Sequence, residues 1–210
     1  MKSSFNAFGK TRDEFGNLTI PVWLGNRVEA VPVGGTLNRD YLKAGALYPA
    51  GCPINLAGKV ITPFLVMQVT AAEEGVLTVN VGNYGIAPTT KDFVQKVGDS
   101  LSGLGEAKAI TAVDETEEKN VYKVTAAIDG VAANDIIVLA PSAGGAVAPN
   151  AYLYNDIYIG KEYDVTEEET AATGAAVMYN PSGILIDRTP ASLIKKQMAA
   201  AVPGVYQHNE

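Results

Sequence analysis

Cysteine and histidine are almost absent from this chain of 210 residues, which has one of each, Cys52 and His208. A single cysteine excludes an internal disulfide framework and every metal site built from several thiolates. Cys52 lies between Gly51 and Pro53 with no basic neighbour in sequence, so we expect a small buried hydrophobic residue rather than a nucleophile. We expect no metal and no cofactor.

Basic residues are outnumbered, with 16 Lys and Arg against 23 Asp and Glu, for a net charge of −7 at pH 7. Because phosphate backbones bind basic surfaces, nucleic acid is not expected as a partner. The most apolar stretch, residues 60–69, is interrupted by Pro63 and is too short to cross a bilayer. Residues 1–17 have no apolar segment typical of a signal peptide. These features predict a soluble protein without membrane contact.

Apolar residues make up 47% of the chain and recur mainly with period two, which is the spacing of half-buried strands. The predicted fold is mainly β, or β-rich α+β, with short antiparallel strands in one or two sandwich-like or barrel-like domains and a C-terminal helix. A parallel α/β sheet would need crossover helices that the pattern does not indicate. We predict an arm at 1–17, a β-rich domain at 18–98 and a second β-domain at 99–210, although the last two could form one sandwich.

Individual strands are predicted from apolar runs between turn residues. Residues 91–97 are compatible with a short helix or a strand. The last three strands before the small-residue segment 142–149 are expected to form a meander. The predicted strands cover residues 52–56, 60–70 with a break at Pro63, 76–81, 107–113, 121–128, 136–140 and 151–159.

Turns and helix ends are indicated by capping residues. Asn38 is placed to cap one helical turn, and the T-x-x-E pattern from Thr166 predicts a short helix ending at Gly174. Residues 180–183 (NPSG) predict a hairpin turn between two strands. Pro190 opens the C-terminal helix, which Pro203 and Gly204 would end.

Residues 1–17 combine both charge signs with the isolated aromatic residues Phe5, Phe8 and Phe15. Such a segment is unable to bury enough surface by itself to offset its ordering entropy. It is therefore either a frayed terminus or an arm that becomes ordered along a partner that covers its phenylalanines.

Tyrosine is the most frequent aromatic residue, with ten copies against five Phe and one Trp. If residues 151–159 form one strand, Tyr152, Tyr154 and Tyr158 point to the same face. Tyrosine offers a large contact area with a polar tip, so this face fits a subunit interface or a sugar-stacking surface. A core with a hydrated edge is the alternative.

The sequence Gly98-Asp99-Ser100-Leu101 resembles the nucleophile block of the GDSL hydrolases, which are esterases of about this length. That resemblance implies a serine esterase with Ser100 as nucleophile and a histidine oriented by an aspartate. In those enzymes a G-x-N-D and a D-x-x-H follow, whereas here Ala132 replaces the glycine and Val205 the aspartate. We interpret the match as chance. The acidic residues at 114–118 and 167–169 are interpreted as a solvated surface.

Three stretches together carry a second resemblance: VGGTLNRDYLKAGALYPAGCPINLAGK at 33–59, PNAYLYNDIYIG at 149–160 and GAAVMYNPSGILIDRTP at 174–190. They resemble the head-fibre or capsid-decoration proteins of tailed bacteriophages, especially crAss-like phages of gut bacteria. This resemblance implies a virion structural protein and not an enzyme. It implies a homo-oligomer, most often a trimer, on the outer capsid surface, assembled in the host cytoplasm.

The resemblance also implies which segments contact which partner. The arm is expected to bind the major capsid protein through Phe5, Phe8, Arg12 and Phe15. The domain at 18–98 would then be capsid-proximal and the domain at 99–210 outermost. The tyrosine face is the expected oligomer or ligand interface, and an adhesion module that binds host or mucus glycans is the main alternative function.

Overall fold

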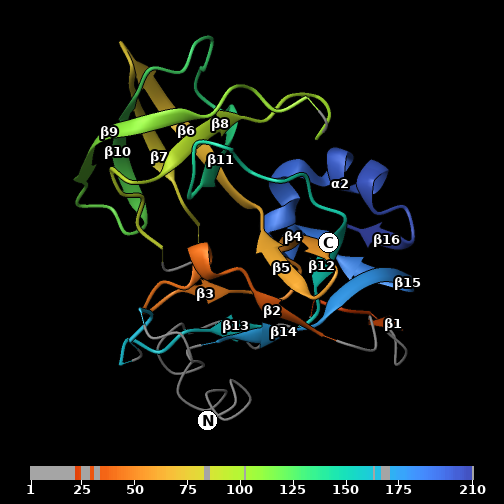
Figure 1. The fold of residues 1–210 in the computed structure, drawn as a ribbon. Coiled ribbons are helices and arrows are strands. Elements are labelled where there is room, and N and C mark those ends of the chain that lie inside the picture. The colour runs from red at the N-terminus through yellow and green to blue at the C-terminus, as the bar shows by residue number, and fades with distance from the viewer. Residues whose placement is uncertain are drawn as a thin grey trace. The chain divides into compact units, whose positions relative to one another are not determined.

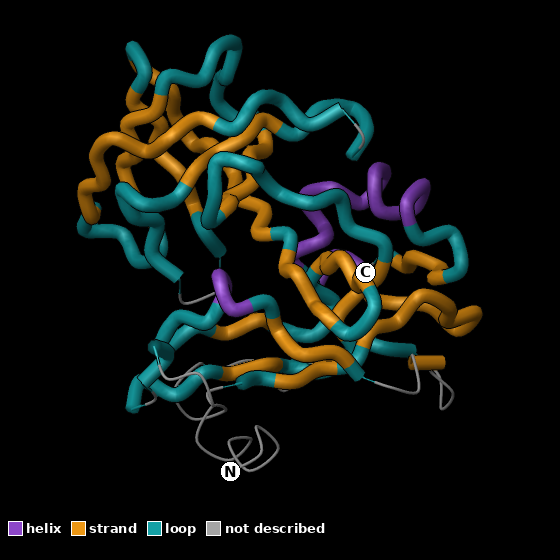
Figure 2. Tube along the Cα trace, viewed as in Figure 1, coloured by secondary structure: helices purple, strands orange, loops and turns teal. Residues whose placement is uncertain are grey.

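The computed structural model describes residues 22–24, 29–30, 34–82, 86–101, 103–162, 164–166 and 171–209. Strands predominate and helices are few in this part of the chain, which confirms the predicted β-rich class with a C-terminal helix (Figure 2). The chain divides into two compact units. Unit 1 combines Met1–Pro63 with Pro149–Glu210, and unit 2 is the intervening segment Phe64–Ala148.

Unit 2 is a closed six-stranded antiparallel barrel, drawn from yellow to green in Figure 1. Its strands pair in the ring order β10-β7-β6-β11-β8-β9. Alternating side chains of β7 are buried, as period two requires for a barrel with a filled interior. The bounds are β6 (Leu65–Glu73), β7 (Val76–Asn80), β8 (Phe93–Lys96), β9 (Lys108–Glu115), β10 (Val121–Ala126) and β11 (Ile136–Ala140).

Unit 1 contains a mixed sheet in the order β1-β15-β12-β4-β5-β2-β14, with β16 also paired to β15, and a separate β13-β3 pair. Its strands are β1 (Glu29–Ala30), β2 (Gly35–Leu37), β3 (Leu47–Tyr48), β4 (Pro53–Ala57), β5 (Val60–Pro63), β12 (Ala151–Leu153), β13 (Ile157–Tyr158), β14 (Thr173–Gly174), β15 (Ala176–Leu185) and β16 (Val205–His208). Its helices are the 3-10 helices η2 (Arg39–Tyr41), η3 (Ile186–Arg188) and η4 (Pro190–Ile194), and α2 (Lys195–Ala201).

The domain boundary predicted after residue 98 falls inside unit 2, between β8 and β9. These two strands pair with each other, so the structure does not divide the chain there. The predicted meander is correct for β9 and β10, which are neighbours, but β11 pairs with β6 and β8 instead. Four of the five β11 residues are buried, and closing the barrel gives this strand a partner on each side. Within residues 91–97 the structure has a strand, β8.

The hairpin predicted at residues 180–183 is wrong, because β15 continues through it as one strand. Asn180 pairs with Val205 and Ile184 with Gln207, so the four residues form a bulge against β16. The local turn chemistry is present, since Asn180 Oδ1 accepts a hydrogen bond from Ser182 N (3.0 Å). The pairing on both sides of the bulge prevents the strand from reversing.

Other local predictions had mixed outcomes. Asn38 caps η2 as expected, with its side-chain oxygen accepting from Asp40 N (3.2 Å). The C-terminal helix is confirmed as η4 followed by α2, with Ile194 and Met198 fully buried. Gly174, the predicted end of a helix, instead lies in β14, and residues 167–170 are outside the described part.

Candidate functional site

The three tyrosines predicted to share a strand face do not share one. Residues 151–159 form two strands, β12 and β13, which belong to different sheets. Tyr152 in β12 is fully buried, Tyr154 follows that strand with 40% of its surface exposed, and Tyr158 in β13 is half-buried. The bend between the strands separates the side chains, so the proposed common face is wrong. Phe5, Phe8, Arg12 and Phe15 lie outside the described residues.

Tyr152 is a core residue with one polar contact. Its hydroxyl accepts a hydrogen bond from Gln207 Nε2 (2.9 Å), and its ring meets Trp23 edge to face with centroids 6.3 Å apart. Burial raises the pKa of Tyr152 to about 12, although the Gln207 hydrogen bond acts in the opposite direction. Trp23 in turn donates its indole N–H to Tyr154 O (2.7 Å), which fixes the end of β12.

The fold does not provide the setting of a GDSL hydrolase. Ser100 lies exposed in the loop after β8, an antiparallel barrel strand, whereas those enzymes place the serine after a strand of a parallel α/β sheet. The imidazole of His208 lies against the ring of Tyr206, with centroids 4.8 Å apart. No group of three potential metal ligands occurs among the described residues.

The strongest candidate for a binding surface lies on the β15–β16 pair, and we call it the aromatic face: Tyr179, Tyr206 and His208. A Cβ built at Gly204 would lie 3.1 Å from Tyr179 Cδ2, so the tyrosine ring packs on the bare glycine. A Cβ built at Gly183 would lie 2.6 Å from His208 Cδ2, so the imidazole packs on a second glycine. Two glycines therefore let two rings lie close to the strand backbone.

The register explains why these rings share one side. In a strand, alternate residues point the same way, so Tyr206 and His208 of β16 face together, and Gly204 lies two residues before Tyr206, just outside the strand. The parallel pairing of Asn180 with Val205 sets Tyr179 beside Gly204 on that side. The opposite side of β16 carries buried Val205 and partly buried Gln207, whose amide donates to the Tyr152 hydroxyl in the core.

The aromatic face is open to solvent. Tyr206 is 64% exposed and Tyr179 is 50% exposed, the two largest values among the exposed tyrosines of the described chain. Neither phenolic oxygen has a hydrogen bond to another described residue. Both hydroxyls are therefore available to an incoming polar group.

No local sequence pattern points to the aromatic face. Tyr179 and Tyr206 come together because β15 and β16 are parallel and are connected by η3, η4 and α2. Parallel neighbours require such a long crossover, so their contacts join residues that are distant in sequence. The sequence does have glycines at positions 183 and 204, but a glycine indicates a turn as readily as a close contact between a ring and the backbone.

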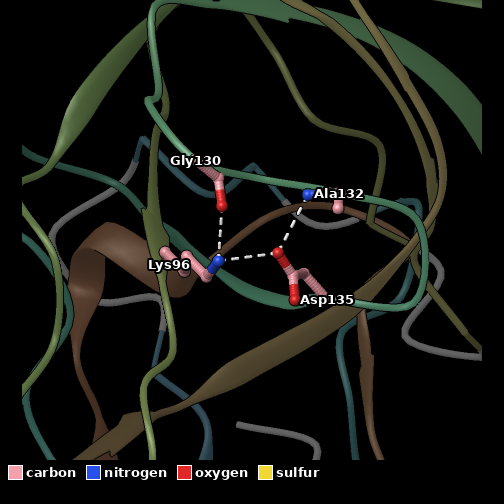
Figure 3. A network of polar contacts seen from close by, with 4 residues as sticks. All are labelled: Lys96, Gly130, Ala132 and Asp135. Carbon is pink, nitrogen blue, oxygen red and sulfur yellow. Dashed lines mark hydrogen bonds and ion pairs between the residues drawn. The ribbon is translucent and has the colours of Figure 1, made fainter.

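Unit 2 contains a polar network that fastens one of its loops (Figure 3). Lys96 Nζ on β8 donates to Gly130 O (2.5 Å) and to Asp135 Oδ2 (2.7 Å), and Ala132 N donates to the same carboxylate oxygen (2.9 Å). The hydrogen bond from Lys96, and next the one from Ala132 N, hold the pKa of Asp135 below its usual value. Because all four groups are satisfied within the network, it has a structural role.

Charge is distributed unevenly between the units. Unit 2 has eleven acidic and five basic residues, a net charge of −6, and unit 1 has twelve and eleven, a net charge of −1. Of the seven exposed large hydrophobic residues in the described chain, all except Val147 belong to unit 1. None of the described helices is long and apolar enough to span a membrane. Exposed apolar surface, where protein contacts form most readily, is therefore concentrated on unit 1.

The fold and these surfaces define a strand-rich protein that consists of an acidic antiparallel barrel inserted into a mixed-sheet unit with an aromatic face. Comparisons with protein-family models, with curated proteins and with solved structures found no match for the chain.

Proposed function

We propose that the chain is a structural subunit of a phage virion, a head-fibre or decoration protein of the outer capsid. In this proposal its N-terminal region binds the major capsid protein and the subunits associate, with a trimer as the favoured oligomer. The role is structural and does not involve catalysis.

One observation supports this proposal most directly. The stretches 33–59, 149–160 and 174–190, on which the phage resemblance rests, all belong to unit 1, although residues 64–148 separate the first from the others. Their strands are direct neighbours, since β12 pairs with both β4 and β15, β3 pairs with β13, and β2 pairs with β14. The resemblance therefore concerns one assembled unit rather than three unrelated phrases.

The charge distribution also suits a subunit present in many copies on one particle. A net charge of −6 on unit 2 makes these barrels repel one another and favours their solvation. Unit 1, with a net charge of −1, opposes association much less. On this reasoning unit 1, which includes the arm, makes the capsid and subunit contacts.

Cosedimentation of the purified full-length protein with empty shells of the phage's major capsid protein tests the capsid contact. The key variant replaces Phe5, Phe8 and Phe15 with alanine, and its matched control replaces Ser3, Ser4 and Asn6 with alanine. Arg12→Ala is examined at low and at physiological salt, because a surface ion pair to the capsid is screened as salt increases.

We expect the full-length protein and the polar control to bind the shells, and the triple phenylalanine variant to lose most binding. Light scattering of the free protein should give the mass of a trimer. Absence of binding by the full-length protein, or equal binding by the two triple variants, would refute the arm contact. Esterase turnover that disappears in Ser100→Ala would refute the purely structural role.

A further inference from the structure

We infer that the aromatic face of Tyr179, Tyr206 and His208 is a binding site for a neutral oligosaccharide. The inference stands on the geometry of the β15–β16 pair and does not depend on the capsid proposal.

The chemistry of the aromatic face matches a sugar ring. The apolar C–H face of a pyranose stacks on an aromatic ring, while its hydroxyl groups need hydrogen-bonding partners at the edge. Tyr206 and Tyr179 present exposed rings whose phenolic oxygens have no partner among the described residues. The imidazole of His208, tilted by 59° against Tyr206, extends the ring surface.

The size of the face argues against a second copy of this chain as its main occupant. A fully exposed aromatic side chain offers about 150–250 Å², so the two tyrosines, 50% and 64% exposed, offer roughly 170–290 Å². A stable protein–protein interface needs about 800 Å² from each partner. The face is therefore large enough for a few sugar rings and too small to hold a subunit by itself.

The rings are held in place before any ligand arrives. The ring of Tyr179 packs on Gly204 and the imidazole of His208 on Gly183. The backbone of both glycines is hydrogen-bonded, since Gly204 O accepts from Asn180 N (2.8 Å) and Gly183 O accepts from Leu24 N (3.0 Å). A site whose rings are already ordered loses little conformational entropy on binding. Ligands that make few contacts, such as oligosaccharides, therefore bind more readily to it.

The composition of the face indicates a neutral ligand. Its three members include no lysine, arginine or carboxylate, and the rest of unit 1 has a net charge close to zero. An anionic sugar would need a cationic partner such as the guanidinium of arginine. Neutral hexose chains are therefore the expected class.

The test uses the full-length protein with cellohexaose, laminarihexaose and lacto-N-neotetraose as probes, followed by saturation-transfer NMR and calorimetric titration. Tyr206→Ala removes a ring, and Tyr206→Phe keeps the ring without its hydroxyl. Tyr154→Ala is the matched control, because Tyr154 is an exposed tyrosine of the same unit outside the aromatic face. Circular dichroism verifies that each variant is folded.

We expect at least one probe to bind, with affinity about tenfold weaker in Tyr206→Ala, weakened less in Tyr206→Phe, which keeps the ring but loses the hydroxyl, and nearly unchanged in Tyr154→Ala. Absence of binding for all three probes overturns the inference. So does binding that is unaffected by Tyr206→Ala or that is lost in Tyr154→Ala. If Tyr206→Ala instead lowers the solution mass of an oligomer and no probe binds, the face is a subunit interface and the inference is wrong.

Discussion

The side chain of Asn180 bridges the bulge of β15 by donating a hydrogen bond from Nδ2 to Gly183 O (2.9 Å). The same amide accepts a hydrogen bond from Ser182 N through Oδ1 (3.0 Å). Asn180 is fully buried, yet both ends of its amide are satisfied within four residues. The bulge brings Gly183 next to Tyr206 and His208, so one buried amide supports the geometry of the aromatic face.

Replacing Asn180 with alanine should therefore reduce stability. The substitution removes the partner of Ser182 N and one of the two partners of Gly183 O, which also accepts from Leu24 N. We expect a loss of about 1–2 kcal/mol in the free energy of unfolding, measured in urea. Asn209→Ala, at an exposed asparagine, should change it by less than about 0.5 kcal/mol. Equal effects of the two substitutions would contradict the bridging role.

Gly183 and Gly58 provide a matched comparison of strain and space. Both have positive φ, +91° and +61°, so alanine is strained at either position. A Cβ at Gly58 would meet nothing within 4 Å, whereas at Gly183 it would lie 2.5 Å from Tyr206 O. We expect Gly58→Ala to cost about 1 kcal/mol and Gly183→Ala about 3 kcal/mol or more, measured by thermal or urea unfolding. A similar cost at both sites would show that the backbone of β16 moves away from the added Cβ at little cost in free energy.

The Lys96–Asp135 pair should make the stability of unit 2 depend on acid pH. Because the folded pKa of Asp135 is lowered, chiefly by Lys96, the pair contributes fully above the unfolded value near 3.9. That contribution is lost as pH falls through the folded pKa. Asp135→Asn should cost about 0.5–1 kcal/mol at pH 7, since both side chains are partly exposed, and progressively less below about pH 4. A cost independent of pH, in urea titrations at both ends of this range, would exclude the ionic contribution.

Tyr152 should influence stability at alkaline pH. Its folded pKa of about 12 lies above the unfolded value near 10, so its contribution is complete below pH 10 and is lost as pH rises to about 12. In Tyr152→Phe the decline in unfolding free energy over this range should be shallower. At neutral pH this variant should lose about 1 kcal/mol, because Gln207 Nε2 loses its acceptor. Tyr206→Phe, at an exposed hydroxyl, is the control. It should have the same unfolding free energy at neutral pH and the same decline at alkaline pH as the parent.

Unit 1 should fold without unit 2. Ile54 pairs with Pro63 on one side and with Ala151 on the other, so Pro63 and Ala151 are two strand spacings apart, about 10 Å, and the insertion ends only a few residues before Ala151. A flexible linker of about six residues spans that distance. A chain with residues 64–148 replaced by such a linker should give a β-type circular dichroism spectrum and dispersed NMR signals. A fragment of residues 1–98, which separates β8 from β9, should give neither a β-type spectrum nor dispersed signals. If this fragment folds and the shortened chain does not, the boundary predicted from the sequence is supported.

Local patterns in the sequence were sufficient for the class of fold and for most of its strands. Period two and turn residues predict the β-rich class, the break at Pro63, the neighbouring strands β9 and β10, and the helix after Pro190. These features depend on neighbours within about ten residues, where side-chain periodicity and capping chemistry decide the outcome.

The tertiary structure decided what local patterns leave open. Barrel closure gives β11 its partners, and it makes unit 2 an insertion between Pro63 and Pro149. The hairpin signal at residues 180–183 yields to pairing on both sides of β15, because ladder hydrogen bonds outweigh one favourable turn. The aromatic face exists only because a helical crossover makes β15 and β16 parallel neighbours. Sequence by itself thus determined the elements, and long-range pairing determined which side chains share a surface.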